Sequence, residues 1–195
     1  VEDLVDRLDS ARGGLLSSSY EYPGRYTRWD MGFVDPPLSV TSHGQEIRLD
    51  ALNERGQVLL SPLRHALQTV DGVSVVDVNT DFLACRVKRS DARFEEEDRS
   101  RQPSAFLAIR AIIDVFAGPD EHLGLYGAFG YDLAFQFEPI ALQLTRPKDQ
   151  RDLVLYLPDE LIVVDHQGGV AERRSYEFTF DGASTAGLGR GGSRQ

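Results

Sequence analysis

The segment LLSSSYEYPGRYTRWD, residues 15–30, decides how the rest of the chain is interpreted. Two leucines run directly into three serines, as in a short apolar strand that ends in hydroxyl groups. Such a strand end leaves hydrogen-bond donors and acceptors that can face a small polar ligand. The alternative is a plain strand edge followed by a turn at Pro23 and Gly24, a pair that suits a type II turn. The serines are followed by aromatic residues and arginines, closed by an aspartate: Tyr20, Tyr22, Arg25, Tyr26, Arg28, Trp29 and Asp30.

Strands are predicted along most of the remaining chain. Residues 45–52 alternate apolar and polar side chains, as a half-buried strand does. Two apolar runs rich in β-branched residues flank Asn79-Thr80-Asp81 and predict a hairpin. The predicted strands comprise residues 45–52, 73–78, 82–87, 153–157, 161–164 and 170–180. Helices are interspersed without βαβ regularity, so we expect an α+β fold with mainly antiparallel sheets.

Two or three helices are predicted in addition to these strands. One lies at the start of the chain, where Leu4, Val5 and Leu8 are spaced for one face. A second is predicted to begin at Ser61-Pro62, because serine caps helices and proline is tolerated in the first turn. Ser104 is predicted to cap the third, which Gly118-Pro119 ends. The expected buried face of this third helix carries Phe106, Ile109, Ile113 and Phe116.

Composition places limits on function. The 195 residues fit one domain, and the net charge of −10 argues against nucleic-acid binding through a basic face. Cys85 is the single cysteine, which excludes an internal disulfide and, with four scattered histidines, a zinc framework. It lies in an apolar run, so we expect a buried structural thiol. No membrane span and no signal peptide are visible, and a cytoplasmic location is expected.

The sequence contains no convincing catalytic set. Asp159 and Glu160 follow Pro158 between two strands and are interpreted as turn residues. Asp165 and His166 could act as a base with its orienting group, but adjacent residues on a strand point to opposite faces. The acidic run at residues 95–98 is interpreted as a solvated loop rather than as a metal site. The glycines at 124, 127 and 130 lack dinucleotide-binding spacing and instead predict a strand that closely approaches another backbone.

Three ordered segments resemble the amino-terminal module of anthranilate synthase component I, particularly the long form fused to its glutamine amidotransferase. Leu15-Leu16-Ser17-Ser18 stands where that family has an LLES-like strand, and Gly24-Arg25-Tyr26-Thr27 stands at its GRYS-like element. Residues 124–138, GLYGAFGYDLAFQFE, resemble its glycine-rich GYFGYD segment. Residues 152–166, DLVLYLPDELIVVDH, resemble the strand pair that follows it.

This resemblance implies a role in making anthranilate from chorismate and glutamine, with release of pyruvate and glutamate. It implies that chorismate and Mg²⁺ bind in a carboxyl-terminal module outside this chain, so the chain alone is expected to be inactive. It also implies feedback inhibition by L-tryptophan and docking of a glutamine amidotransferase. The sister synthases for aminodeoxychorismate or phenazine precursors, and a stand-alone amino-acid-binding or docking module, are the alternatives.

The resemblance assigns Leu16, Ser17 and Ser18 to the tryptophan-contacting strand. Ser17 departs from the family, which usually has a glutamate at that position, so one possible partner for a ligand ammonium is missing. The run of three serines leaves the register open by one residue, with Ser19 as the alternative to Ser18.

The two ends of the sequence indicate a piece of a longer polypeptide. The chain begins at Val1 within a helical pattern, and residues 182–195 are the glycine- and serine-rich GASTAGLGRGGSRQ. We therefore expect a domain at residues 1–180 and a flexible linker or truncated end at residues 181–195. A frayed tail of an intact small protein is the alternative.

Overall fold

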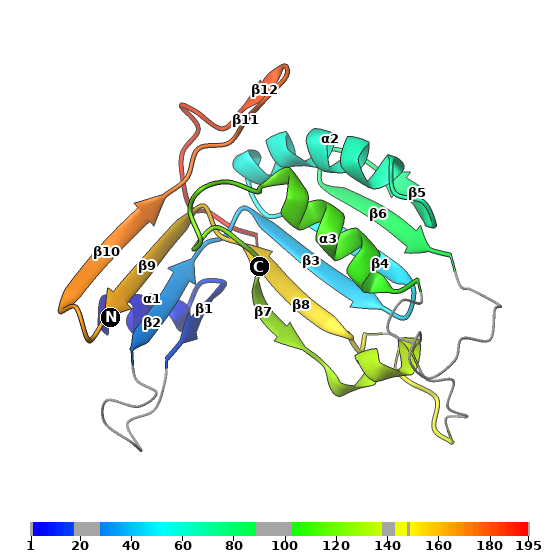
Figure 1. Ribbon diagram of the computed structural model, residues 1–195, viewed down its shortest axis with the longest axis horizontal. Helices are drawn as coiled ribbons and strands as arrows, with labels where there is room; N and C mark the ends of the chain where they lie inside the picture. Colours follow the sequence, from blue (N-terminus) through cyan, green and yellow to red (C-terminus); the bar gives the residue numbers. More distant parts are fainter. Residues whose placement is uncertain (1, 18–27, 89–102, 138–142, 148, 195) are drawn as a thin grey trace.

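Two antiparallel sheets and their covering helices form the fold in the computed structural model, which describes residues 2–17, 28–88, 103–137, 143–147 and 149–194 (Figure 1). The larger sheet has six strands in the order β5-β6-β4-β3-β8-β7, and the smaller has four in the order β1-β2-β9-β10. The α+β class with mainly antiparallel sheets is therefore confirmed. Among the described residues, no helix combines the length and the apolar character that crossing a bilayer requires.

The strands of the four-stranded sheet are β1 (Gly13–Leu16), β2 (Trp29–Val34), β9 (Glu160–Asp165) and β10 (Val170–Ser175). Those of the six-stranded sheet are β3 (Leu38–His43), β4 (Glu46–Ala51), β5 (Val73–Val78), β6 (Phe82–Val87), β7 (Tyr126–Phe129) and β8 (Leu153–Leu157). A short hairpin joins β11 (Thr179–Phe180) to β12 (Ala183–Ser184). The helices are α1 (Glu2–Leu8), α2 (Glu54–Gln68), α3 (Ala105–Val115) and the 3-10 helix η2 (Tyr131–Gln136).

Two bent connections carry the chain from one sheet to the other. Strand β2 continues into β3 through Asp35-Pro36-Pro37, and β8 continues into β9 through Pro158 and Asp159. Proline lacks a backbone donor, so it interrupts a sheet ladder at these bends. Because β2 pairs with β9 and β3 pairs with β8, the two bends lie side by side. The two sheets are thus joined along one corner of the molecule.

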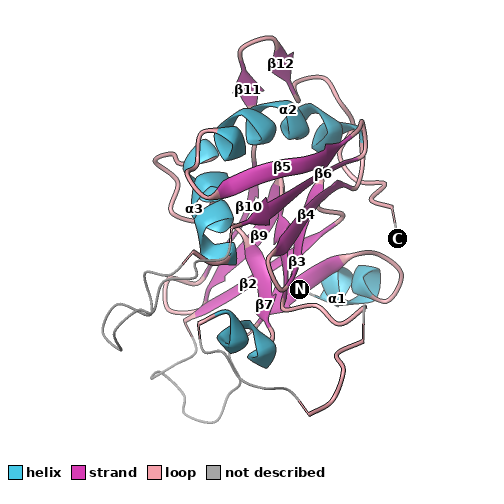
Figure 2. Ribbon diagram, turned by 90° about the vertical axis from the view of Figure 1, so that its right-hand side faces the viewer, coloured by secondary structure: helices cyan, strands magenta, loops and turns pink. Residues whose placement is uncertain are grey.

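The main hydrophobic core lies between the six-stranded sheet and helices α2 and α3, which cover one face of that sheet (Figure 2). A smaller core of Phe33, Leu161 and Val163 lies on the inner face of the four-stranded sheet. Tyr126 and Tyr156 pack against it from the six-stranded sheet. Helix α1 packs on the opposite, outer face, where a Cβ on Gly32 would lie 2.2 Å from Leu4 Cδ2.

Helix α2 begins at Glu54, so the predicted start at Ser61-Pro62 is wrong. The N-cap is Asn53, whose side chain accepts a hydrogen bond from the Gly56 amide at 3.1 Å. Pro62 lies inside the helix. The asparagine cap satisfies one of the free amides of the first turn, and packing of the buried leucine face holds the helix past the proline. The leucines of that face are Leu59, Leu60, Leu63 and Leu67.

Helix α3 is confirmed, but its buried face is rotated from the predicted one. Ile109 is buried as predicted, and Ile112 is also buried, whereas Ile113 is 44% exposed. Ser104 occupies the N-cap position without making a side-chain cap bond. The Ala105 amide instead donates to Gln136 Oε1 of η2 at 2.9 Å. The group that caps this helix therefore comes from a distant part of the chain, and a local sequence pattern cannot predict it.

The close backbone approach predicted for the glycine-rich segment is confirmed at Gly127. A Cβ at this position would lie 2.0 Å from the carbonyl oxygen of Val154 on the neighbouring strand β8. No side chain fits there without moving the backbone. Among the described residues, no heavy atom beyond Gly124 and its chain neighbours lies within 4 Å of a Cβ built on Gly124.

Much of the segment predicted as a flexible end lies against the body of the structure. Thr185 is fully buried, Ser193 Oγ donates to the Pro36 carbonyl at 2.7 Å, and the Arg194 amide donates to the Leu52 carbonyl at 2.8 Å. The single strand predicted at residues 170–180 is also divided, because β10 ends at Ser175 and β11 belongs to another sheet. A domain boundary near residue 180 stays a prediction.

Candidate functional site

The residues that the sequence assigns to a ligand lie at the end of strand β1. Leu16 is the last residue of β1 that pairs with β2, opposite Met31, and it is 43% exposed. Met31 in turn lies opposite Val163 of β9, so these three residues share the inner face of the four-stranded sheet. Ser17 directly follows. Ser18 and its alternative Ser19 lie outside the described residues.

Ser17 contacts the opposite, outer face of the sheet. Its hydroxyl donates to Asp30 Oδ1 at 2.9 Å, and Asp30 lies between Trp29 and Met31 on β2, both of which face inward. The second oxygen, Asp30 Oδ2, lies 2.8 Å from His166 Nε2. One carboxylate therefore links the end of β1 to the turn that follows β9.

The turn after β9 is held by a second carboxylate. Asp165 Oδ1 accepts the amides of Gln167 and Gly168, both at 3.0 Å, and Asp165 Oδ2 pairs with Arg28 at 3.3 Å. The Gly168 amide and then the Arg28 guanidinium lower the pKa of Asp165 below its ordinary value of 3.8. The His166 amide donates to the Arg28 carbonyl at 2.8 Å. Asp165 and His166 thus take separate partners, as strand alternation predicts.

Aromatic rings fill the space between the two sheets near this strand end. Trp29 meets His122 edge-on, with ring centroids 6.0 Å apart. The ring centroid of Phe33 lies 6.0 Å from that of Tyr126 and 5.9 Å from that of Tyr156. Through these contacts the inner face of the sheet is covered by packed, largely apolar aromatic rings.

A polar bridge lies beside these rings. Asp120 accepts the His122 amide at 3.0 Å, the Arg174 guanidinium at 3.0 Å and the Tyr176 hydroxyl at 3.2 Å. The His122 amide and the Arg174 guanidinium lower the pKa of the Asp120 carboxyl. Burial, together with the charge of Asp120, raises the pKa of Tyr176. Asp120 therefore stays ionised and links the segment before β7 to the end of β10.

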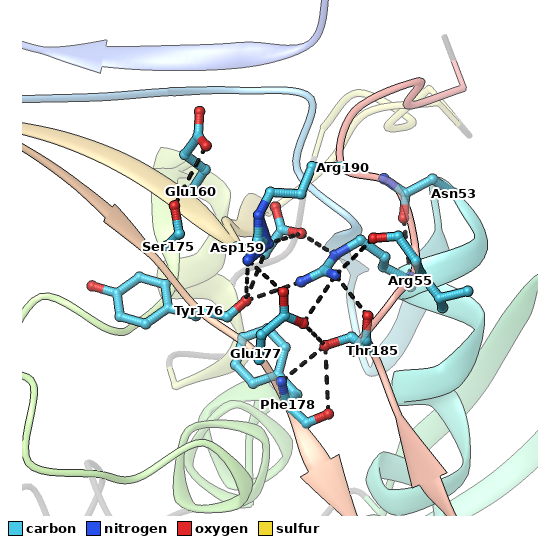
Figure 3. A network of polar contacts seen from close by, with 12 residues as sticks. Asn53, Arg55, Asp159, Glu160, Ser175, Tyr176, Glu177, Phe178, Thr185 and Arg190 are labelled. Carbon is cyan, nitrogen blue, oxygen red and sulfur yellow. Dashed lines mark hydrogen bonds and ion pairs between the residues drawn. The ribbon is translucent and has the colours of Figure 1, made fainter.

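The largest fully buried side chain among the described residues is Arg55, which belongs to a different cluster (Figure 3). Arg55 lies in the first turn of α2, is fully buried, and donates to Asp159, which is 3% exposed. It also pairs with Glu177 at 3.1 Å, and Arg190 pairs with both acids. The same guanidinium donates to the carbonyls of Tyr176, Thr185 and Leu188. Asp159 does lie in a turn between strands, but the sequence did not predict its burial or its partner.

Several carboxylates of the described region are bound by arginines. Four of these pairs are Asp120 with Arg174, Asp152 with Arg146, Asp159 with Arg55, and Asp165 with Arg28. Within that part of the chain, no group of three or more histidine, cysteine, aspartate or glutamate side chains is arranged to hold a metal ion. The acidic run at residues 95–98 lies outside the described residues.

Comparison with known proteins identifies the family. The chain is 49% identical over 193 residues to an anthranilate synthase of Azospirillum brasilense, covering 98% of this chain and 26% of that protein. It is 30% identical over 182 residues to anthranilate synthase component 1 of Serratia marcescens, covering 90% of this chain and 34% of the relative. The component 1 protein of Escherichia coli is 31% identical over 159 residues, 78% of this chain and 29% of the relative.

No protein-family model matches the chain. The chain spans about a quarter to a third of the length of the curated relatives that it matches. Each of these relatives is named an anthranilate synthase or its component 1, and the identity to the first extends over nearly all of this chain. Over the part that it spans, this chain belongs to the anthranilate synthase component 1 family.

Proposed function

We propose that this chain is the amino-terminal regulatory and structural part of an anthranilate synthase. The whole protein would convert chorismate and glutamine to anthranilate, pyruvate and glutamate in tryptophan biosynthesis. The observation that carries this proposal is the 49% identity over 98% of the chain to an anthranilate synthase. Identity of that extent across a whole sheet-and-helix unit supports a shared role for the unit.

The relative lengths of the matched proteins support the form fused to a glutamine amidotransferase. A match of 193 residues covers 26% of the Azospirillum protein, whereas a match of 182 residues covers 34% of the Serratia protein. The Azospirillum protein is therefore the longer of the two, as expected for a chain that carries an additional domain. A glutamine amidotransferase, as a domain or a subunit, is the proposed partner.

Mg²⁺ and chorismate are proposed to bind outside this chain. Mg²⁺ prefers carboxylate oxygens that are not already neutralised. The buried carboxylates of the described region, Asp152 and Asp159, are each bound by an arginine, which supports a structural use for these groups. The chemistry of the reaction is then assigned to the remainder of the protein, with this chain as its support.

The inner face of the four-stranded sheet is proposed as one wall of an inhibitory L-tryptophan site formed by Leu16, Ser17 and Ser18. Leu16 offers a half-exposed apolar side chain beside Met31 and Val163, which suits an indole ring. Ser17 turns its hydroxyl to Asp30 on the other face, so its contribution to the ligand is expected through the backbone. The opposite wall would come from the remainder of the protein.

The test is an anthranilate fluorescence assay of the complete protein with chorismate, glutamine and Mg²⁺, with and without L-tryptophan. Anthranilate formation that tryptophan suppresses supports the proposal. Replacement of Leu16 by alanine should raise the inhibitory tryptophan concentration by about tenfold, since a buried leucine contact contributes roughly 1.5–3 kcal/mol. Formation of aminodeoxychorismate instead of anthranilate would favour the sister synthase.

A further inference from the structure

The end of strand β1 has little backbone support of its own. β1 is an edge strand, and its four residues pair with β2 alone, ending at the Leu16–Met31 pair. An edge strand this short frays readily, because few hydrogen bonds hold its last residue. The contact that extends the pairing by one residue is the hydrogen bond from the Ser17 hydroxyl to Asp30.

Asp30 is suited to hold Ser17 because both of its oxygens are engaged. Oδ1 accepts from Ser17 at 2.9 Å and Oδ2 lies 2.8 Å from His166 Nε2. The Asp30 side chain is 14% exposed, whereas that of His166 is 47% exposed. His166 is itself fixed by its amide bond to the Arg28 carbonyl and by the turn that Asp165 organises. The carboxylate therefore has one orientation that satisfies both neighbours.

The protonation of His166 changes the strength of this link. A charged imidazolium holds a carboxylate more firmly than a neutral ring does. The charged groups next to His166 are Arg28 and Asp165, which pair with each other at 3.3 Å. From α1, Leu4 packs on the same sheet face at Gly32. Asp30 is thus the anion in direct contact with the His166 ring.

The contacts of Asp30 with Ser17 and His166 lie on the outer face of the sheet, while the Leu16 side chain lies on the inner face. Asp30 and His166 can therefore affect a ligand at Leu16 only through the position of the strand. We propose that Asp30 and His166 are positioning residues that fix the end of β1. Protonation of His166 strengthens their contact and thereby increases the affinity of the site for the inhibitor. This inference rests on the proposed tryptophan site, although the link itself does not.

The experiment compares the complete protein with its Asp30→Asn, His166→Ala and His166→Gln variants. His65→Gln is the matched control, since His65 is an exposed histidine on α2. Two quantities are measured at pH 6 and pH 8. The first is hydrogen exchange of peptides covering β1, read by mass spectrometry and corrected for the intrinsic pH dependence. The second is the inhibition constant for L-tryptophan.

In the wild type and in His65→Gln, β1 should exchange more slowly at pH 6 than at pH 8. The tryptophan inhibition constant should be lower at pH 6 by about 1.5- to 5-fold, the range of a partly exposed ion pair. His166→Ala and Asp30→Asn should speed β1 exchange at both pH values. His166→Gln keeps a donor, so it should restore part of the protection while losing the pH dependence.

Equal hydrogen exchange of β1 in His166→Ala and in the wild type would overturn the inference, whatever the value of the tryptophan inhibition constant. Faster β1 exchange in His166→Ala with an unchanged tryptophan inhibition constant would also overturn it, because the link would not position the site. A wild type that tryptophan does not inhibit would refute the proposed tryptophan site instead. In that case the exchange data alone decide whether Asp30 and His166 fix the strand.

Discussion

Arg55 shows how one buried side chain can hold distant segments together. Each of its three guanidinium nitrogens donates to an acceptor, and these acceptors lie on the β8–β9 turn and on the segment from Tyr176 to Leu188. Burial raises the pKa of Asp159 above its ordinary value of 3.8, while Arg55 and Arg190 oppose this effect. Without Arg55, a buried carboxyl and several carbonyls would lose a donor.

Arg55→Met should therefore lower the free energy of unfolding by about 3–5 kcal/mol, as expected when one partner of a buried ion pair is removed. Arg86→Met is the matched control, because Arg86 is 57% exposed and pairs with an equally exposed Glu46. Its effect should stay below about 1 kcal/mol. Urea denaturation measures both values, and equal losses in the two variants would contradict the role assigned to Arg55.

At the scale of single residues, the sequence predicted what local context determines. Cys85 was predicted as a buried thiol from its apolar run, and it is fully buried, with burial raising its pKa to about 12. Asp159 was predicted only as a turn residue. It does follow Pro158 between two strands, but its partner Arg55 lies 104 residues away. No spacing along the chain encodes such a pair.

Among the elements, several strands were predicted with nearly their observed bounds, but β2 and β3 were not predicted at all. The hairpin β5–β6 has the bounds that its two β-branched runs predict. Helix α2 begins eight residues before the predicted start at Pro62, because the Asn53 cap and the leucine face outweigh the proline signal. In the candidate site, too, local sequence signals and tertiary contacts must be distinguished. Leu16 and Ser17 were assigned from their motif, and that assignment stays a prediction. The contacts of Ser17 with Asp30 and of Asp30 with His166 arise only through the pairing of β1, β2 and β9.

Helix α3 offers a sharp test of its orientation. Ile109→Asp should unfold or insolubilise the protein, because it places a charge on the buried face and should cost about 3 kcal/mol or more. Ile113→Asp, on the same helix but 44% exposed, should change the free energy of unfolding by about 1 kcal/mol or less. Soluble yield and thermal unfolding give the comparison. Similar damage from both variants would mean that the helix is rotated from the orientation described.

For the molecule as a whole, the paired carboxylates predict a loss of stability in acid. The pKa values of Asp120, Asp165 and Glu177 are lowered from 3.8, 3.8 and 4.5, first by hydrogen bonds from the His122 amide, the Gly168 amide and the Thr185 hydroxyl, respectively. A lowered folded-state pKa adds stability above the unfolded value, and that stability is lost as the pH falls through the folded value. Asp159, with its raised pKa, acts in the opposite direction.

Hydrogen bonds from Arg194 and Gln57 also lower the pKa of Asp81. The free energy of unfolding should therefore decrease as the pH falls from about 5 to 3, with four lowered carboxylates outweighing the raised one. Asp165→Asn should make this decrease smaller, since it removes one of the four carboxylates with a lowered pKa. Urea denaturation at pH 6, 4.5 and 3 provides the measurement. Equal or higher stability at pH 3 would show that these carboxylates do not contribute as described.

The fold class was predictable from the sequence because strand alternation and turn residues are local signals. The corner that joins the two sheets was not predicted, since it depends on β2 pairing with β9 while β3 pairs with β8. The packing of residues 183–194 against the rest of the structure could likewise not be predicted from their composition. Their glycines and serines indicate a linker, but Thr185 and Arg190 complete the cluster around Arg55.

We propose that this chain supports an anthranilate synthase whose chemistry resides elsewhere in the protein. The most direct measurement compares the 195-residue chain with the complete protein, each incubated with chorismate, Mg²⁺ and either glutamine or ammonia. Anthranilate is followed by its fluorescence. The complete protein should turn over at about 1 to 1,000 per second, and the chain alone should form no anthranilate above background. Turnover by the chain alone, or none by the complete protein, would contradict the account.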